Sequence, residues 1–407
     1  GRLMWTTFLD ALLLQAGYNA TLVAVGAALL GVAAGTTGTF LVLRKRALVS
    51  DAIAHATLPG IGLAFICMIA LGGDGRNLAG LMLGSALTAA AGLLLVAWIS
   101  RATRLSEDAA IGAVLSVFFG FGIVLLTLIQ TMSSGRQAGL DGLLLGSTAG
   151  MLFQDGIIIA VGGALAVAAV FALRRPMTLV AFDAEFAKAS GWNVGYIDLA
   201  IMGLVLGVTV IGLKIVGLIL IVAMLIIPAV SARFWTERTE HVVLGAGLIG
   251  GLSGYVGAAL SASAPAVPTG PIIVLVCAFL FVLSLLFAPI RGVLASLLRH
   301  RRFQVRVHRR QGLLALAHSE AIHDRMTLAV LRRDGLIRAD GVATDIGRAQ
   351  AAKALLDERR WEIVRQLQFA EGAKANFDGL TPIEGVLTKD ELAEVDRRLG
   401  PLSIVGG

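Results

Sequence analysis

The chain has 407 residues, of which 57% are hydrophobic and only 15% are charged, and its mean hydropathy is +0.84. A typical soluble domain has about 25% charged residues, so this composition excludes an ordinary soluble protein and indicates a polytopic membrane protein. Residues 1–290 hold 14 Lys/Arg and 12 Asp/Glu, whereas residues 291–407 hold 20 and 15, so we expect a membrane body to end near Ile290 and a mildly basic soluble domain to follow.

Long apolar segments follow one another through the first 290 residues. Uncharged runs occupy residues 20–43, 52–73, 78–100, 109–131, 156–173, 199–213, 215–232 and 242–290. A membrane span needs roughly 20 residues, so the last run provides two spans, separated by the proline-rich segment 264–271. Residues 1–19 are apolar around Asp10 and predict either an interfacial helix or one more span. The predicted membrane domain, residues 20–290, is therefore all-α, with about eight or nine transmembrane helices.

The basic residues give the orientation of these spans. Most of the basic residues fall on one side of the membrane: Arg44 to Arg46, Arg101 and Arg104, Arg174 and Arg175, Arg233 and Arg238, and the tail after Arg291. The opposite loops carry only Arg76, Arg136 and Lys214. Because Lys and Arg concentrate in cytoplasmic loops, the first side is predicted to be the cytoplasm, with the C-terminal domain on that side.

Two ionisable residues, Asp51 and His55, lie at the start of the second apolar run. Their i, i+4 spacing puts both on one face of a helix, where a carboxylate oxygen and an imidazole nitrogen can reach the same cation. Ionisable groups in a membrane segment are costly and usually functional, and this pair of ligands suits manganese, iron or zinc. The alternatives are a helix cap at Asp51 and a hydrogen bond from His55 to a neighbouring helix.

The cytoplasmic loop after Arg175 contains a short charged segment, residues 183–191. Its pattern predicts a short amphipathic helix that ends at Gly191. Such a helix is either an ordinary solvated surface element or a docking element for a cytoplasmic partner.

Several motifs occur in a fixed order along residues 20–290. They are the segment 38–60 with Asp51-Ala52-Ile53-Ala54-His55, Glu107 to Gly112, Asp183 to Gly191, Lys214 to Gly217 leading to Ile227-Pro228-Ala229, and Pro268-Thr269-Gly270-Pro271. In this order they resemble the integral-membrane permeases of bacterial ABC importers for zinc, manganese and iron.

The resemblance implies a role for two of the matching segments. Asp51 and His55 match the residues that contact the metal in the translocation path. Segment 183–191 matches the part that rests in a groove of the ATPase subunit, which gives Asp183, Glu185, Phe186, Ala187 and Gly191 as coupling residues.

The resemblance also implies the partners of the chain. Two permeases, identical or related, pair around one pathway, and an extracytoplasmic binding protein delivers the metal at the cytoplasmic (inner) membrane. The chain has no GxxxxGK[ST] loop, so ATP is expected to be bound and hydrolysed by a separate cytoplasmic subunit. We therefore expect a non-catalytic translocation subunit with no bound cofactor, whose cargo is the metal.

Residues 291–407 predict a small cytoplasmic α/β domain. The segment 322–338 indicates a helix that runs into a short strand, and another helix begins after Ala343 behind a Thr or Asp cap. This order resembles the winged-helix domain of metalloregulators of the diphtheria-toxin-repressor type, with Trp361 in its core. Its net charge of +5 is modest for binding nucleic acid and equally suits anionic membrane lipid, so we expect a regulatory or protein-binding role rather than DNA binding.

Two other classes of function remain open on the residues alone. An ion-coupled secondary transporter would use Asp51 and His55 as a proton relay. A membrane-anchored regulator would act through its C-terminal domain.

Overall fold

The computed structural model describes residues 2–73, 75, 77–132, 151–213, 217–263, 267–366 and 380–399. Within these residues it is built from helices, and the β pairing is limited to one antiparallel bridge between Ile337 and Ala343. The chain divides into two compact units, residues 1–295 and 296–407, each of which is described by itself.

Eight helices of the first unit are long and apolar enough to cross a membrane, which confirms the predicted fold class. A ninth apolar helix, α10 (Leu218–Trp235), has 18 residues with Pro228 inside it. The eight are α2 (Tyr18–Leu43), α3 (Ala47–Ala70), α4 (Leu78–Ala102), α5 (Glu107–Thr131), α7 (Phe153–Phe182), α9 (Val194–Gly212), α11 (Thr239–Ala262) and α12 (Thr269–Phe287). The predicted orientation stays a prediction, and Arg76, Arg136 and Lys214 lie outside the described residues.

The N-terminal helix α1 (Arg2–Leu12) has 11 residues. At 1.5 Å per residue it is about 17 Å long, which is short of a hydrocarbon core of about 30 Å. Its end is held by the Tyr255 hydroxyl of α11, which donates a hydrogen bond to the Leu12 carbonyl. The interfacial helix and the additional span stay alternative predictions for residues 1–19.

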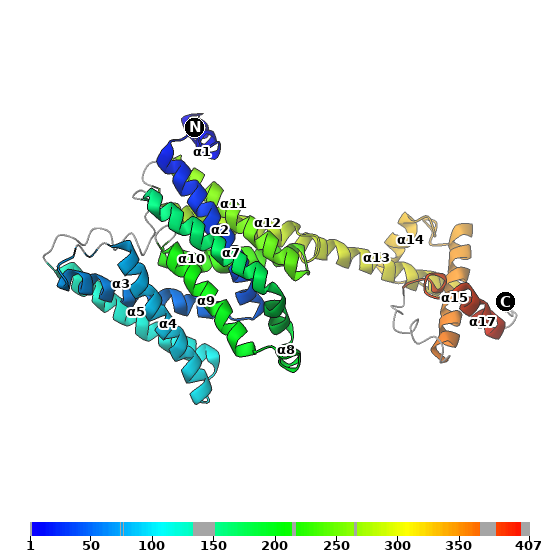
Figure 1. Cartoon of the computed structure of the whole chain (residues 1–407). Coiled ribbons are helices and arrows are strands. Elements are labelled where there is room, and N and C mark those ends of the chain that lie inside the picture. Colours follow the sequence, from blue (N-terminus) through cyan, green and yellow to red (C-terminus); the bar gives the residue numbers. More distant parts are fainter. Residues whose placement is uncertain are drawn as a thin grey trace. The chain divides into compact units, whose positions relative to one another are not determined.

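Helices α2 and α11 pack backbone against backbone (Figure 1). A Cβ atom added to Gly31 would lie 2.1 Å from the Gly250 carbonyl oxygen, and one added to Gly254 would lie 2.1 Å from the Ala27 carbonyl oxygen. Only glycine permits this approach, because any side chain at these positions would overlap the facing backbone. We call these contacts the glycine seam.

Helices α3, α4 and α5 form a second group in the first unit (Figure 1). Here too glycine sets the spacing, since a Cβ atom on Gly60 of α3 would lie 2.2 Å from the Gly84 carbonyl oxygen of α4. This group meets the remaining helices chiefly where α3 packs on α9 and α10 and where α4 packs on α9.

The described residues of the second unit form four helices and a short 3-10 turn. They are most of α13 (Val293–Ala317), α14 (Arg325–Arg333), α15 (Asp345–Gln366), η2 (Ile383–Gly385) and α17 (Lys389–Leu399). Trp361, expected in the core, is 1% exposed and packs with Val364, Ile383 and Val395. The order α14, bridge, α15 follows the predicted helix, strand and helix, but the strand is a single bridge, and the winged-helix assignment stays a prediction.

The buried carboxyl of Asp357 makes the second unit sensitive to pH. Burial, and next the Glu384 carboxylate, raise the pKa of Asp357 above its ordinary value of 3.8. The folded state therefore binds a proton on Asp357 more tightly than the unfolded state does. The protonated carboxyl contributes to stability below pH 3.8, and this contribution is lost as the pH rises from that value through the raised pKa.

Asp357→Asn should consequently stabilise the second unit at neutral pH and flatten its pH dependence. Hydrogen exchange of the α15 amides in the full chain, corrected for intrinsic rates, measures this. Asp345→Asn, which changes a 92% exposed side chain of the same helix, is the matched control. Faster exchange at neutral pH in the Asp357 variant would contradict the expectation.

Candidate functional site

The candidate metal site lies on α3, where the structure brings Asp51 and His55 together. The His55 Nε2 atom is 3.3 Å from the Asp51 Oδ1 atom. The helix begins at Ala47, so Asp51 and His55 stand about 6 Å and 12 Å along its axis. Both ligand types are thus presented on one face, within the first half of a membrane-spanning helix.

This face of α3 is partly open. The Asp51 side chain is 41% exposed and that of His55 is 18% exposed, and the His55 ring meets Phe119 of α5 edge-on at 4.9 Å between centroids. A carboxylate this exposed on a membrane helix requires water, an ion or another protein beside it, because lipid cannot solvate it. The geometry therefore fits an aqueous pathway or an interface.

A third potential ligand comes from Pro59, which lies inside α3. Proline has no N–H group, so the carbonyl oxygen of His55, four residues earlier, loses its helical donor. The freed carbonyl oxygen therefore belongs to the same residue as the imidazole.

The two alternatives for this pair do not match the geometry. The residue preceding α3 is Arg46, and Asp51 lies in the second turn, so Asp51 does not cap the helix. The buried Nδ1 atom of His55 has no hydrogen-bond partner among the described residues. No cluster of three or more His, Cys, Asp or Glu side chains suited to a metal occurs in the described part of the chain, and the candidate site on α3 consists of two side chains.

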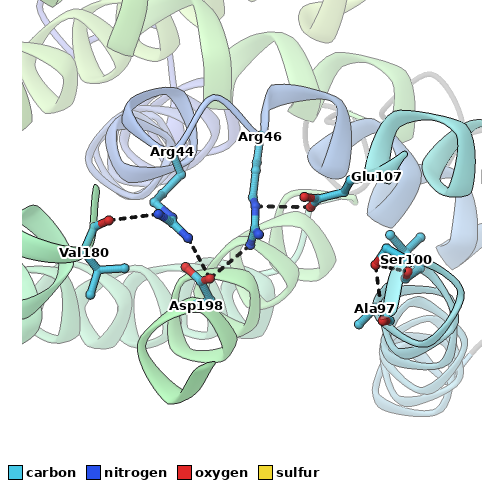
Figure 2. A network of polar contacts seen from close by, with 8 residues as sticks. Arg44, Arg46, Ala97, Ser100, Glu107, Val180 and Asp198 are labelled. Carbon is cyan, nitrogen blue, oxygen red and sulfur yellow. Dashed lines mark hydrogen bonds and ion pairs between the residues drawn. The ribbon is translucent and has the colours of Figure 1, made fainter. Parts of the chain in front are cut away.

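A charged network lies next to the start of α3, and Figure 2 shows it centred on Asp198 of α9. The Asp198 Oδ2 atom accepts hydrogen bonds or ion pairs from Arg44 Nη2 at 2.7 Å and from Arg46 Nη1 at 3.3 Å. Arg44 Nη1 also donates to the Val180 carbonyl at 2.8 Å, and Arg46 Nε is 3.1 Å from Glu107 Oε1. We call Arg44, Arg46, Glu107 and Asp198 the arginine network.

The turn between α2 and α3 aims both arginines at one carboxylate. Lys45, between them, has a left-handed backbone with φ of 58°, and the amide of Arg46 donates to the Leu41 carbonyl at 3.1 Å. This helix-ending turn reverses the chain within three residues. The arginine network therefore ties the ends of α2, α3, α5, α7 and α9 together within the first unit (Figure 2).

From the sequence, Arg44 and Arg46 predict the orientation, and nothing in their spacing points to Asp198. The partners of Asp198 lie more than 150 residues away, so no local spacing predicts the pairing. One signal was present: Asp198 is a lone carboxylate within the first turns of an apolar helix, where an unpaired charge is costly.

The predicted segment 183–191 forms the short helix α8 (Ala184–Ala189). The Asp183 side chain caps it by accepting a hydrogen bond from the Phe186 amide at 2.9 Å, and Gly191 ends it with φ of 86°. Ala187 is fully buried, whereas Phe186 is 58% exposed and Glu185 is exposed. One face is thus anchored, and an apolar and an acidic side chain project from the other.

A short covalent and ionic path leads from α8 to Asp51. Helix α9 begins five residues after Ala189, and Asp198 is its fifth residue. Asp198 holds Arg46, the residue that precedes α3, and Asp51 follows five residues later. A displacement of α8 can therefore reach the candidate ligands through one charged contact.

Comparison with known proteins gives consistent matches over the membrane unit. Residues 18–288 match the family model described as the ABC 3 transport family. The chain is 41% identical over 298 residues to the manganese transport system membrane protein MntC of Bacillus subtilis (strain 168), covering 73% of this chain and 67% of that protein. It is 37% identical over 285 residues to the zinc transport system membrane protein TroC of Treponema pallidum (strain Nichols), covering 70% and 94%.

A solved structure matches the same part of the chain. PsaBC from Streptococcus pneumoniae, in complex with Fab, superposes with a TM-score of 0.60 and 28% identity, covering 70% of this chain and 96% of that one.

Proposed function

The chain belongs to the ABC 3 transport family, and from this premise we propose that it is the permease subunit of an ATP-driven importer of a divalent transition metal. The proposal is carried by one observation: a half-exposed carboxylate and an imidazole 3.3 Å apart on a membrane-spanning helix. Such a pair is costly in a bilayer unless it serves a polar path.

We propose manganese or zinc as the cargo, because the two relatives with the highest identities above are named for transport of these metals. One carboxylate and one imidazole suit both ions, and iron as well. Zinc would be the tighter binder of the three at this site.

Asp51 and His55 act as transient ligands in the pathway. Two side-chain ligands from one chain leave a metal ion under-coordinated, so a second permease, identical or related, would contribute its own pair. Weak, shared coordination suits transport, because an ion has to leave the site as readily as it enters.

The energy comes from a separate cytoplasmic ATPase, and an extracytoplasmic binding protein delivers the metal. In this proposal α8 docks on the ATPase through its exposed face, with Phe186 as the apolar contact and Glu185 beside it. The C-terminal unit would then lie in the cytoplasm, where a winged-helix-like domain could regulate the assembly or bind a further protein.

The assembly with its ATPase and binding protein, reconstituted in vesicles, tests this function. Uptake of radioactive manganese or zinc should require ATP and should persist when the proton gradient is collapsed. Uptake that needs the gradient and not ATP would overturn the proposal in favour of a secondary transporter.

Phe186→Ala should weaken binding of the ATPase subunit by at least about tenfold, because burying a phenylalanine side chain contributes about 1.5–3 kcal/mol. The measurement is the affinity of the detergent-solubilised chain for the purified ATPase. Leu105→Ala, which removes a 53% exposed apolar side chain from the loop between α4 and α5, is the control. Equal affinities for wild type and the Phe186 variant would remove α8 as the docking element.

A further inference from the structure

A groove flanked by α7 and α11 lies over α2 and is separate from the candidate metal site. It is open and has a volume of about 540 Å³. Its rim carries Arg174, Arg175 and Arg238, and its floor includes the buried Phe40 and Val243. Water alone would leave the apolar floor exposed to solvent, and lipid tails alone would leave the basic rim without counter-charges.

The charge of the groove is unbalanced. Arg174 Nη2 is 3.6 Å from Glu240 Oε1, the one acidic side chain of the lining. Arg175 and Arg238 form no ion pair among the described residues. Three guanidinium groups against one carboxylate leave a surplus positive charge, so the groove fits an anion.

The helices set the level of the groove in the membrane. Arg174 follows Phe153, the first residue of α7, by 21 positions, which corresponds to about 32 Å of helix and so to the thickness of the hydrocarbon core. Arg238 immediately precedes α11. By the predicted orientation all three arginines then lie at the cytoplasmic headgroup layer.

We propose that this groove binds an anionic phospholipid of the cytoplasmic leaflet, with its phosphate between Arg175 and Arg238 and an acyl chain against Phe40 and Val243. Basic pockets between membrane helices on the cytoplasmic side are suited to anionic headgroups. An acidic peptide would satisfy the rim and leave the apolar floor uncovered, whereas a phospholipid satisfies both. The lipid would brace α7, which leads directly into α8, against α11.

Native mass spectrometry of the full chain, titrated with dioleoylphosphatidylglycerol or dioleoylphosphatidylcholine, tests the proposal. The wild-type chain should bind the anionic lipid in preference to the zwitterionic one. The double variant Arg175→Gln/Arg238→Gln should lose about tenfold in affinity for phosphatidylglycerol. Arg101→Gln/Arg104→Gln, with the same change of charge at two exposed arginines outside the groove, should bind as wild type does.

A variant with the opposite effect separates lipid binding from misfolding. Glu240→Gln removes the one carboxylate of the groove and should raise the affinity for phosphatidylglycerol. Unchanged affinity in both the double variant and the Glu240 variant would overturn the proposal, as would equal binding of the two lipids. Equal occupancy by glycerol 3-phosphate at the same concentration would overturn the assignment to a membrane lipid.

Discussion

Replacing either Asp51 or His55 with alanine should abolish metal uptake by the assembled importer while leaving the chain in the membrane. Each substitution removes one of the two proposed side-chain ligands, and in an assembly of two identical chains it removes two of four. Neither residue belongs to the buried hydrophobic cluster that packs α3, so the fold should survive. The measurement is ATP-dependent uptake of radioactive manganese or zinc into vesicles at equal protein content.

Nearly isosteric variants sharpen this prediction. Asp51→Asn keeps the size of the side chain and removes the anionic ligand, so it should also fail, with uptake lowered by about a hundredfold if the ligand contributes roughly 3 kcal/mol. Asp108→Asn and His241→Gln change exposed groups of the same types at the starts of α5 and α11, and should transport normally. Normal uptake by both the Asp51 and His55 variants would refute the site.

Asp198→Asn should uncouple ATP hydrolysis from transport. Its carboxylate holds two guanidinium groups at 2.7 Å and 3.3 Å, with side chains 15–27% exposed, and hydrogen bonds to charged groups contribute about 1.5–3 kcal/mol each. Without that carboxylate, α9 loses its charged contact with Arg46, and movement of α8 and α9 reaches α3 only through the packing of α3 on α9. Uptake should fall by about tenfold or more, while ATP hydrolysis by the assembly continues.

Two further variants distinguish coupling from simple loss of structure. Glu107→Gln breaks only the contact with Arg46 and should have a smaller effect. Uptake by the double variant Arg44→Gln/Asp198→Asn should fall by less than the sum of the falls in the two single variants, because both members of one ion pair are removed. Uptake and hydrolysis that decline in parallel with the amount of folded protein would argue against a coupling role for Asp198.

Local pattern was sufficient for the helices and for the candidate ligands. The apolar run after Asp51 predicted α3, the four-residue spacing placed Asp51 and His55 on one face, and Gly191 correctly marked the end of α8. These features depend on residues within a few turns of one another, and helical geometry is regular enough to predict them.

Features that join distant parts of the chain were not predictable in this way. The link from Arg44 to Asp198 spans 154 residues, and the groove of Arg174 and Arg238 depends on how α7 and α11 pack on α2. In the C-terminal unit the expected strand is reduced to the pair Ile337 and Ala343. Such contacts arise from tertiary packing, and they cannot be predicted from the spacing of residues along the sequence.

The glycine seam has a consequence for how such a permease can change shape. Backbones that touch without intervening side chains cannot slide or rotate past one another without collision, so we expect α2 and α11 to move as one rigid body. Helices α3, α4 and α5 form a separate group that meets α9 and α10 and is tied at one end by the arginine network. Opening and closing would then be a hinged tilt of this smaller group, so that the helix bearing Asp51 and His55 is itself the moving part.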